Sequence, residues 1–143
     1  MKKLSLKINS DTENVELVTE CVRALCLFTS LSQASVDGVQ LAVTEAVNNV
    51  ILHSYKGESS HPIWLTISLQ DEYLTMSLSD TGVGMEPILL QADRSSVTEI
   101  EPDDVMRLDE GGRGLFLIKA TMDKVNYHSD GGTHTLQMTK YFD

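Results

Sequence analysis

The chain has 143 residues, of which 21 are acidic and 11 basic, so its formal net charge at neutral pH is -10. This length suits a single hydrophobic core, and we expect one domain over residues 1–143. The acidic excess argues against a nucleic-acid surface, which needs clustered Lys and Arg, and favours a basic or neutral protein partner. No apolar run approaches the roughly 20 residues that span a bilayer, and the N-terminal segment lacks a signal-peptide core, so we expect a cytoplasmic protein without a membrane partner.

The first half of the sequence predicts one strand followed by two helices. Leu4, Leu6 and Ile8 alternate with polar residues, which is the period of a half-buried strand. Apolar residues then recur every three or four positions from about 12 to 28, which indicates an amphipathic helix with N-cap candidates at 9–11. After a loop at 29–35, a second helix is expected to run to about residue 55, with Ser35 or Asp37 as its N-cap.

The second half predicts two hairpins, a long polar segment and one more helix. Apolar residues alternate over 63–69 and 74–78, which indicates a hairpin. Residues 86–110 are polar and without a sustained period, and a connection of that length is typical of a lid or binding segment. A helix follows from 112, with Leu115, Ile118 and Met122 on one face. Two last strands meet at 130–132, where two glycines favour a tight turn.

These elements predict an α+β fold, a two-layer sandwich with helices on one face of a mostly antiparallel sheet. The two cysteines, Cys21 and Cys26, lie five residues apart in the first predicted helix. That spacing suits neither a zinc site nor one face of a helix, so we interpret both as reduced thiols that pack in the fold.

The second predicted helix carries a polar pair in an apolar sequence. At 3.6 residues per turn its valines and Ile51 form a core-facing stripe, while Glu45 and Asn49 share another face flanked by Leu41 and Leu52. A helix that is apolar nearly all round is normally buried, and a buried carboxylate costs several kcal/mol unless it is paired. Glu45 therefore needs a partner, which is either a Lys or Arg elsewhere in the chain or a bound group.

Three short motifs occur in order: EAVNN at 45–49, DTGVG at 80–84 and GGRG at 111–114. Each alone is typical of an ordinary helix or turn. In this order and spacing they resemble the N box and the two glycine boxes of the GHKL, or Bergerat-fold, ATPases. Within that superfamily the chain is most similar to the anti-sigma factors that are also serine-protein kinases, in bacterial partner-switching systems. The resemblance covers nearly the whole chain, because the element order around the motifs also agrees.

The resemblance implies a role for each polar motif residue. Asn49 matches the Mg²⁺ ligand, a neutral oxygen donor that leaves the ion free for the triphosphate. Glu45, one turn earlier, matches the general base toward the attacking hydroxyl. Asp80 matches the aspartate that accepts a hydrogen bond from the adenine amino group. Asn48 lies about 100° round the helix from Asn49 and is interpreted as a capping or structural amide.

The resemblance also implies roles for the glycines. Gly82 and Gly84 would let the main chain approach the base and let the lid hinge. Gly112 and Gly114 would expose backbone N–H groups to the phosphates at the start of a helix, where the helix dipole favours anions. Arg113 between them either reaches a phosphate or a partner, or faces solvent.

The implied function is a serine/threonine-protein kinase that uses ATP and Mg²⁺, phosphorylates an anti-anti-sigma (STAS-type) protein and also binds a sigma factor. A homodimer is the assembly that the family favours. Two alternatives remain: a non-catalytic ATP-binding regulatory module, and a stand-alone ATP-binding domain of a two-component kinase. Glu45 favours the kinase, because a pure binder needs no base. A phosphohistidine role for His53 is disfavoured, since no dimerisation helices are seen upstream. Glu110 departs from the wider superfamily, which often has a glycine there.

Overall fold

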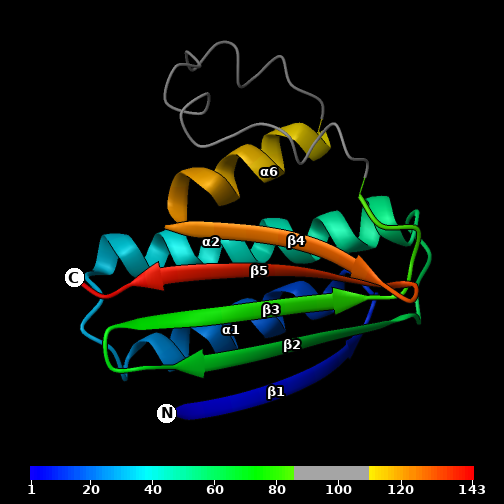
Figure 1. Cartoon of the computed structure of the whole chain (residues 1–143). Helices are drawn as coiled ribbons and strands as arrows, with labels where there is room; N and C mark the ends of the chain where they lie inside the picture. The colour runs from blue at the N-terminus through cyan, green and yellow to red at the C-terminus, as the bar shows by residue number, and fades with distance from the viewer. Residues whose placement is uncertain (86–109) are drawn as a thin grey trace.

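The computed structural model describes residues 1–85 and 110–143, with 110–113 described by their main chain only. An antiparallel five-stranded sheet has the order β1-β2-β3-β5-β4. Its strands are β1 (Lys2–Asn9), β2 (Pro62–Leu69), β3 (Tyr73–Asp80), β4 (Lys124–Asp130) and β5 (Thr133–Tyr141). Figure 1 shows the sheet with its helices lying to one side.

The helices form the second layer. They are α1 (Glu13–Cys26), α2 (Gln33–Asn49), a single π-helical turn η1 (Val50–Ser54) that continues α2, and α6 (Glu110–Thr121). α2 lies between α1 and α6 and packs against both. The predicted two-layer α+β sandwich is therefore confirmed. No helix in the described part of the chain is long and apolar enough to cross a membrane.

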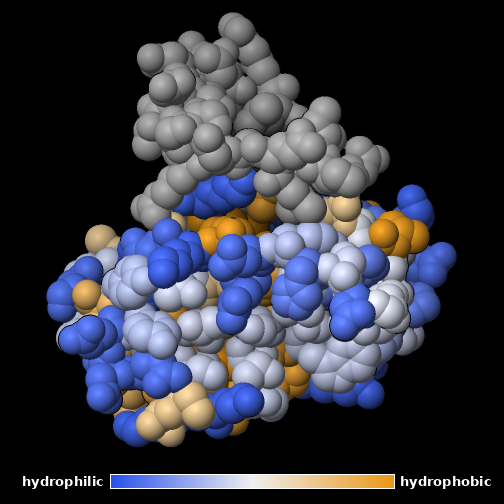
Figure 2. Space-filling model, in the orientation of Figure 1, coloured by the Kyte–Doolittle hydropathy of each residue, from blue (hydrophilic) through white to orange (hydrophobic). Residues whose placement is uncertain are grey.

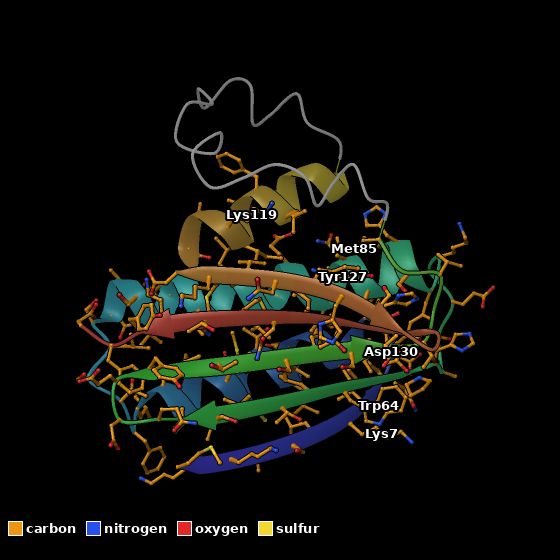
Figure 3. All side chains as sticks on the ribbon, viewed as in Figure 1. Lys7, Trp64, Met85, Lys119, Tyr127 and Asp130 are labelled. Carbon is orange, nitrogen blue, oxygen red and sulfur yellow. The ribbon has the colours of Figure 1, made fainter. Side chains whose placement is uncertain are left out.

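The core lies between the sheet and the helices, as the alternating strand patterns predicted. Apolar residues of β2 and β3 face the helices and are almost fully buried, among them Ile63, Ile67, Met76 and Leu78. The alternate positions of these strands carry mostly Ser and Thr and form the outer face of the sheet, where Trp64 is 38% exposed. Figure 2 looks onto this outer face, and Figure 3 shows Trp64 beside Lys7, its register partner on the edge strand β1.

One face of α2 is buried as predicted, but its other flank is not. The stripe of Val43, Val47, Val50 and Ile51 is buried. However, Leu52 is 41% exposed and Glu45 is only partly buried, so the expectation of a helix buried nearly all round is wrong. The reason is that this flank lines a pocket instead of packing against another element.

The N-terminal ends of the first two helices differ from the prediction. The N-cap of α2 is Ser32, whose hydroxyl accepts a hydrogen bond from the Ser35 N–H at 3.2 Å. The helix consequently begins inside the predicted loop. The N-cap of α1 is Thr12, which makes no side-chain capping bond. Ser10 is buried and instead binds the loop before β2, donating to the carbonyl of Glu58 at 2.7 Å.

The last helix and hairpin agree with their sequence patterns. Leu115, Ile118 and Met122 are buried, although α6 begins at Glu110, two residues before the predicted start. The β4–β5 turn has Gly131 at φ 59° and Gly132 at φ 83°, a conformation that glycine adopts without strain. The remainder of the predicted lid, 86–109, lies outside the described residues. Both cysteines are free thiols, and burial raises the pKa of Cys26 to about 11.

Candidate functional site

The N box and the second glycine motif meet in one pocket. This pocket has a volume of about 410 Å³ and lies between α2 and α6, next to the start of α1. Its lining consists of Thr12, Glu45, Asn48, Asn49, Leu52, Gly114 and Leu117. Residues 45, 48 and 49 of α2 and residue 52 of η1 recur at the spacing of one helix face, so this segment presents three polar side chains and Leu52 to the pocket.

Gly114 brings α6 directly against the polar pair of α2. A Cβ added to Gly114 would lie 3.0 Å from Oδ1 of Asn49 and 3.0 Å from Oε2 of Glu45. Contacts of that length are tighter than nine in ten contacts of a real Cβ, so a side chain at 114 would have to push the ends of Glu45 and Asn49 aside. The structure therefore joins two motifs that lie about 65 residues apart in the sequence.

Asn49 is the buried polar group of this site. The residue is 5% exposed, and its Nδ2 finds no hydrogen-bond partner among the described residues. An unpaired buried polar group costs about 1–3 kcal/mol, so a bound group that pairs with this amide would be favoured. The nitrogen and oxygen of a carboxamide can exchange places by a flip of the group, so this amide can offer a bound group either its N–H or its oxygen.

The residues fit Mg²⁺ only in company with other ligands. Within residues 1–85 and 110–143, no cluster of three or more His, Cys, Asp or Glu side chains could hold a metal ion. Mg²⁺ usually keeps several waters and takes few protein ligands together with substrate phosphates. A single amide oxygen from Asn49, with nucleotide oxygens and water completing the shell, matches that chemistry.

A second cluster forms where β3 ends. Asp80 is the last residue of β3 and is 3% exposed. Its Oδ1 accepts hydrogen bonds from the Ser54 hydroxyl and, at 2.9 Å, from the Gly82 N–H. A Cβ on Gly82 would lie 2.3 Å from the Ser54 carbonyl oxygen, so this loop passes the end of α2 with no room for a side chain.

The β4–β5 hairpin supports the same loop from the other side. The Met85 N–H donates to the Tyr127 hydroxyl at 3.0 Å, and Figure 3 shows these two residues close together. Nε2 of His134 donates to the carbonyl of Gly82 at 3.0 Å, a direction set by the carbonyl, which can only accept. Gly84 has φ 81°, and a Cβ there would meet the His134 ring at 2.9 Å. Burial raises the pKa of Tyr127, so its phenol stays protonated at neutral pH.

A family model for the histidine kinase-like ATPase domain matches residues 8–140. The chain belongs to this family. That match covers all three motifs and every described helix, so the pocket between α2 and α6 is a pocket of a histidine kinase-like ATPase domain.

Several curated relatives of this ATPase domain carry one name. The serine-protein kinase RsbW of Listeria innocua is 28% identical over 139 residues, which cover 97% of this chain and 87% of that protein. The serine-protein kinase RsbW of Bacillus velezensis is 27% identical over 138 residues, which cover 96% of this chain and 84% of that one. The chain thus spans most of the length of both relatives.

Two solved structures share the fold. The SiaB–SiaC complex of Pseudomonas aeruginosa contains a chain that matches with a TM-score of 0.71 at 14% identity, over 94% of this chain and 88% of that one. A structure of the RsbU and RsbW domains of a Mycobacterium tuberculosis protein matches with a TM-score of 0.66 at 15% identity. It covers 98% of this chain but 32% of that one, so this ATPase domain corresponds to about a third of the longer protein.

The second glycine motif lies differently from its expected position in the ATPase domain. Because α6 begins at Glu110, Gly114 is its fifth residue and lies beyond the four N–H groups that a helix leaves unpaired. Gly114 thus faces the N box with its Cα instead of presenting a free N–H at the helix start. Gly112 lies in the first turn of α6, where a main-chain N–H has no partner within the helix itself. The side chain of Arg113 lies outside the described residues, so its role stays a prediction.

Sequence reasoning missed two kinds of site residue. Asn48 was interpreted as a structural amide, yet it lines the pocket with Glu45, and their spacing of three residues could have placed it there. Ser54 had no such signal, because the π-helical turn that carries it breaks the regular helical period. His134 and Tyr127 come from the last hairpin, and only the folded sheet brings them to the Gly82–Gly84 loop.

Proposed function

We propose that this chain is a protein kinase that binds Mg·ATP in the pocket between α2 and α6. It transfers the γ-phosphate to a serine or threonine of a small anti-anti-sigma (STAS-type) protein. The observation that carries this proposal is the contact of both Glu45 and Asn49 with Gly114 inside one pocket. The relatives named serine-protein kinase RsbW support the reaction class.

Each polar residue has a separate task in the proposed reaction. A bond forms between the acceptor oxygen and the γ-phosphorus, the bond from that phosphorus to the β–γ bridging oxygen breaks, and ADP leaves. Glu45 takes the proton of the acceptor hydroxyl. Asn49 would hold Mg²⁺, which would neutralise charge on the phosphates. Asp80 accepts a hydrogen bond from the 6-amino group of adenine, whereas guanine presents a carbonyl at that position.

The proposal includes a second, non-catalytic partner. In a cytoplasmic partner switch, the chain retains a sigma factor in one nucleotide state and releases it when the anti-anti-sigma protein binds. The net charge of -10 suits protein partners with basic or neutral contact surfaces. Glu45 is what separates a kinase from an ATP-dependent binding module, because retention of a sigma factor needs no base.

The experiment is affinity capture from the source cell with the tagged chain in Mg·ATP, in Mg·ADP and in EDTA, followed by phosphosite mapping of each retained protein. We expect different partners in ATP and ADP, and a small acceptor phosphorylated on serine or threonine in ATP alone. The Asn49→Ala variant should lose both effects, since its site lacks the Mg²⁺ ligand.

The matched control is Glu72→Ala, which removes a carboxylate from the β2–β3 turn at the opposite end of β3 from Asp80. This variant should capture and phosphorylate like the wild type. Identical partners in all three conditions, with no phosphorylated acceptor, would contradict the kinase proposal and favour a binding module.

A further inference from the structure

Ser54 lies where the N box meets the loop that follows β3. It ends the π-helical turn η1, five residues after Asn49, and is 2% exposed. Single π-helical turns inside or at the end of α-helices are rare and occur frequently at functional sites. The roles proposed above for Glu45, Asn49 and Asp80 leave this buried hydroxyl unassigned.

The hydroxyl of Ser54 stands in the middle of a directed chain of hydrogen bonds. The Gly84 N–H donates to Ser54 Oγ at 2.9 Å, so this oxygen acts as an acceptor on one side. On the other side it donates to Oδ1 of Asp80, because a carboxylate can only accept. The single hydroxyl proton is therefore committed to Asp80.

Oδ1 of Asp80 is consequently fully engaged. It receives the Ser54 hydroxyl on one side and the Gly82 N–H, at 2.9 Å, on the other. Two donors on one oxygen hold the carboxylate plane in a single orientation, and they leave the second oxygen, Oδ2, to act as the acceptor for a ligand. The orientation of Asp80 thus depends on a residue of the α2–η1 segment.

The main chain of Ser54 fixes the same loop. Its carbonyl accepts a hydrogen bond from the Val83 N–H at 2.8 Å. That carbonyl also lies so close to Gly82 that a Cβ there would stand 2.3 Å from it. Residue 54 therefore holds the loop at three consecutive positions, two through its oxygen atoms and one through close packing.

We propose that Ser54 is a specificity-determining positioning residue for the purine base. Its hydroxyl holds Oδ1 of Asp80, so that Oδ2 is presented to the 6-amino group of adenine. Through the short η1 turn it also links the base end of the site to Asn49 at the phosphate end. This inference rests on the proposed function, since it assumes that Asp80 binds adenine.

The test compares two nucleotides that differ only at the amino group. Mg·ATP and Mg·purine riboside triphosphate, which lacks the 6-amino group, are titrated calorimetrically into the wild type and into Ser54→Ala. Loss of one buried hydrogen bond to a charged group should weaken ATP binding about tenfold or more. Binding of the purine riboside analogue should change less than about twofold, because it makes no hydrogen bond to Asp80.

The matched control is Ser79→Ala. Ser79 is the residue before Asp80, and its hydroxyl bonds to Thr135 at 2.8 Å on the outer face of the sheet. This variant loses the same atom from the same strand without touching Asp80, so both nucleotides should bind as in the wild type. A double variant, Ser54→Ala with Asp80→Asn, should bind ATP no more weakly than Asp80→Asn alone, because the serine acts through the aspartate.

Two results would overturn the inference, and a third separates it from the proposed function. If Ser54→Ala weakens the binding of both nucleotides by the same factor, the residue has only a general structural role. If Ser54→Ala binds ATP like the wild type while Asp80→Asn binds ATP more weakly, Ser54 does not position Asp80, and the adenine role of Asp80 is kept. If Asp80→Asn itself binds ATP like the wild type, Asp80 does not bind the adenine amino group, and the inference about Ser54 is wrong as well.

Discussion

Gly114 is the residue at which the two halves of the site touch. Its Cα faces Oε2 of Glu45 and the carboxamide of Asn49, and a side chain here would fill the gap between α6 and α2. Sequence reasoning assigned this glycine a role in exposing a backbone N–H. In the structure the Gly114 N–H lies beyond the unpaired first turn of α6, and the position of its missing Cβ lies 3.0 Å from both Glu45 and Asn49.

We expect Gly114→Ala to weaken Mg·ATP binding about tenfold or more, because its Cβ would displace both Glu45 and Asn49. The control is Gly38→Ala in α2, where a Cβ would lie 3.4 Å from Thr121. Removing a glycine from a helix interior stabilises it by about 0.5–1 kcal/mol, so this control should bind ATP normally and unfold at a slightly higher temperature. If Gly114→Ala and Gly38→Ala bind ATP with the same affinity, Gly114 is not part of the nucleotide site.

At this scale the sequence could predict residues whose position follows from a regular period. Glu45 and Asn49 share a face of α2 because they are four residues apart, and Asp80 ends a strand of period two. The sequence could not place Ser54 in the site, because a residue five positions after Asn49 lies about 140° away from it round a regular α-helix. The contacts of His134 and Tyr127 depend on how the last hairpin closes on the Gly82–Gly84 loop, which no local pattern encodes.

Among the elements, α6 decides whether the pocket exists. It packs against α2, its Leu115 and Ile118 are 2% and 0% exposed, and its Gly114 and Leu117 line the pocket. The sequence predicted this buried face from the spacing of its apolar residues. Packing of α6 on α2 is therefore a condition for the pocket to form, and we expect it to contribute to stability as well.

Ile118→Ala should lower the free energy of unfolding by about 2–5 kcal/mol, because it leaves a cavity in the fully buried contact between α6 and the core. Leu17→Ala, at a position that is 58% exposed on α1, should change it by less than about 0.5 kcal/mol. Urea unfolding followed by circular dichroism measures both. If Ile118→Ala lowers the free energy of unfolding by less than about 1 kcal/mol, α6 is only loosely attached to the helix layer.

Element boundaries were predicted less well than element types, and the start of α2 shows why. Ser32 and Ser35 are both plausible N-caps by residue type. The side chain of Asp143 accepts hydrogen bonds from the Ser32 N–H at 2.5 Å and the Ser35 hydroxyl at 3.3 Å. The bond from the Ser32 N–H is the main cause that lowers the pKa of Asp143. The contact of Ser32 and Ser35 with Asp143, more than a hundred residues away, therefore helps to fix where α2 begins. The local sequence does not encode such a contact.

In the whole molecule, the helix layer contributes Glu45 and Asn49, and the sheet contributes Asp80 at the end of β3. The loop after β3, the end of α2 and the first turns of α6 converge at one side of the helix layer, while the Ser- and Thr-rich outer face of the sheet contributes nothing to the pocket. The α+β architecture was predictable because hydrophobic periods determine element types. The pocket itself depends on how α6 packs on α2, and it required the structure.

The most direct test of the central claim is the rate of phosphate transfer from γ-labelled ATP to the captured acceptor by Glu45→Gln. Glutamine keeps the size of the side chain but cannot take a proton. We expect Mg·ATP affinity close to the wild type and phosphate transfer slower by about 10²–10⁴-fold. Glu72→Gln should transfer at the wild-type rate. If Glu45→Gln phosphorylates the acceptor as fast as the wild type, Glu45 is not the base, and the kinase mechanism proposed for this pocket is wrong.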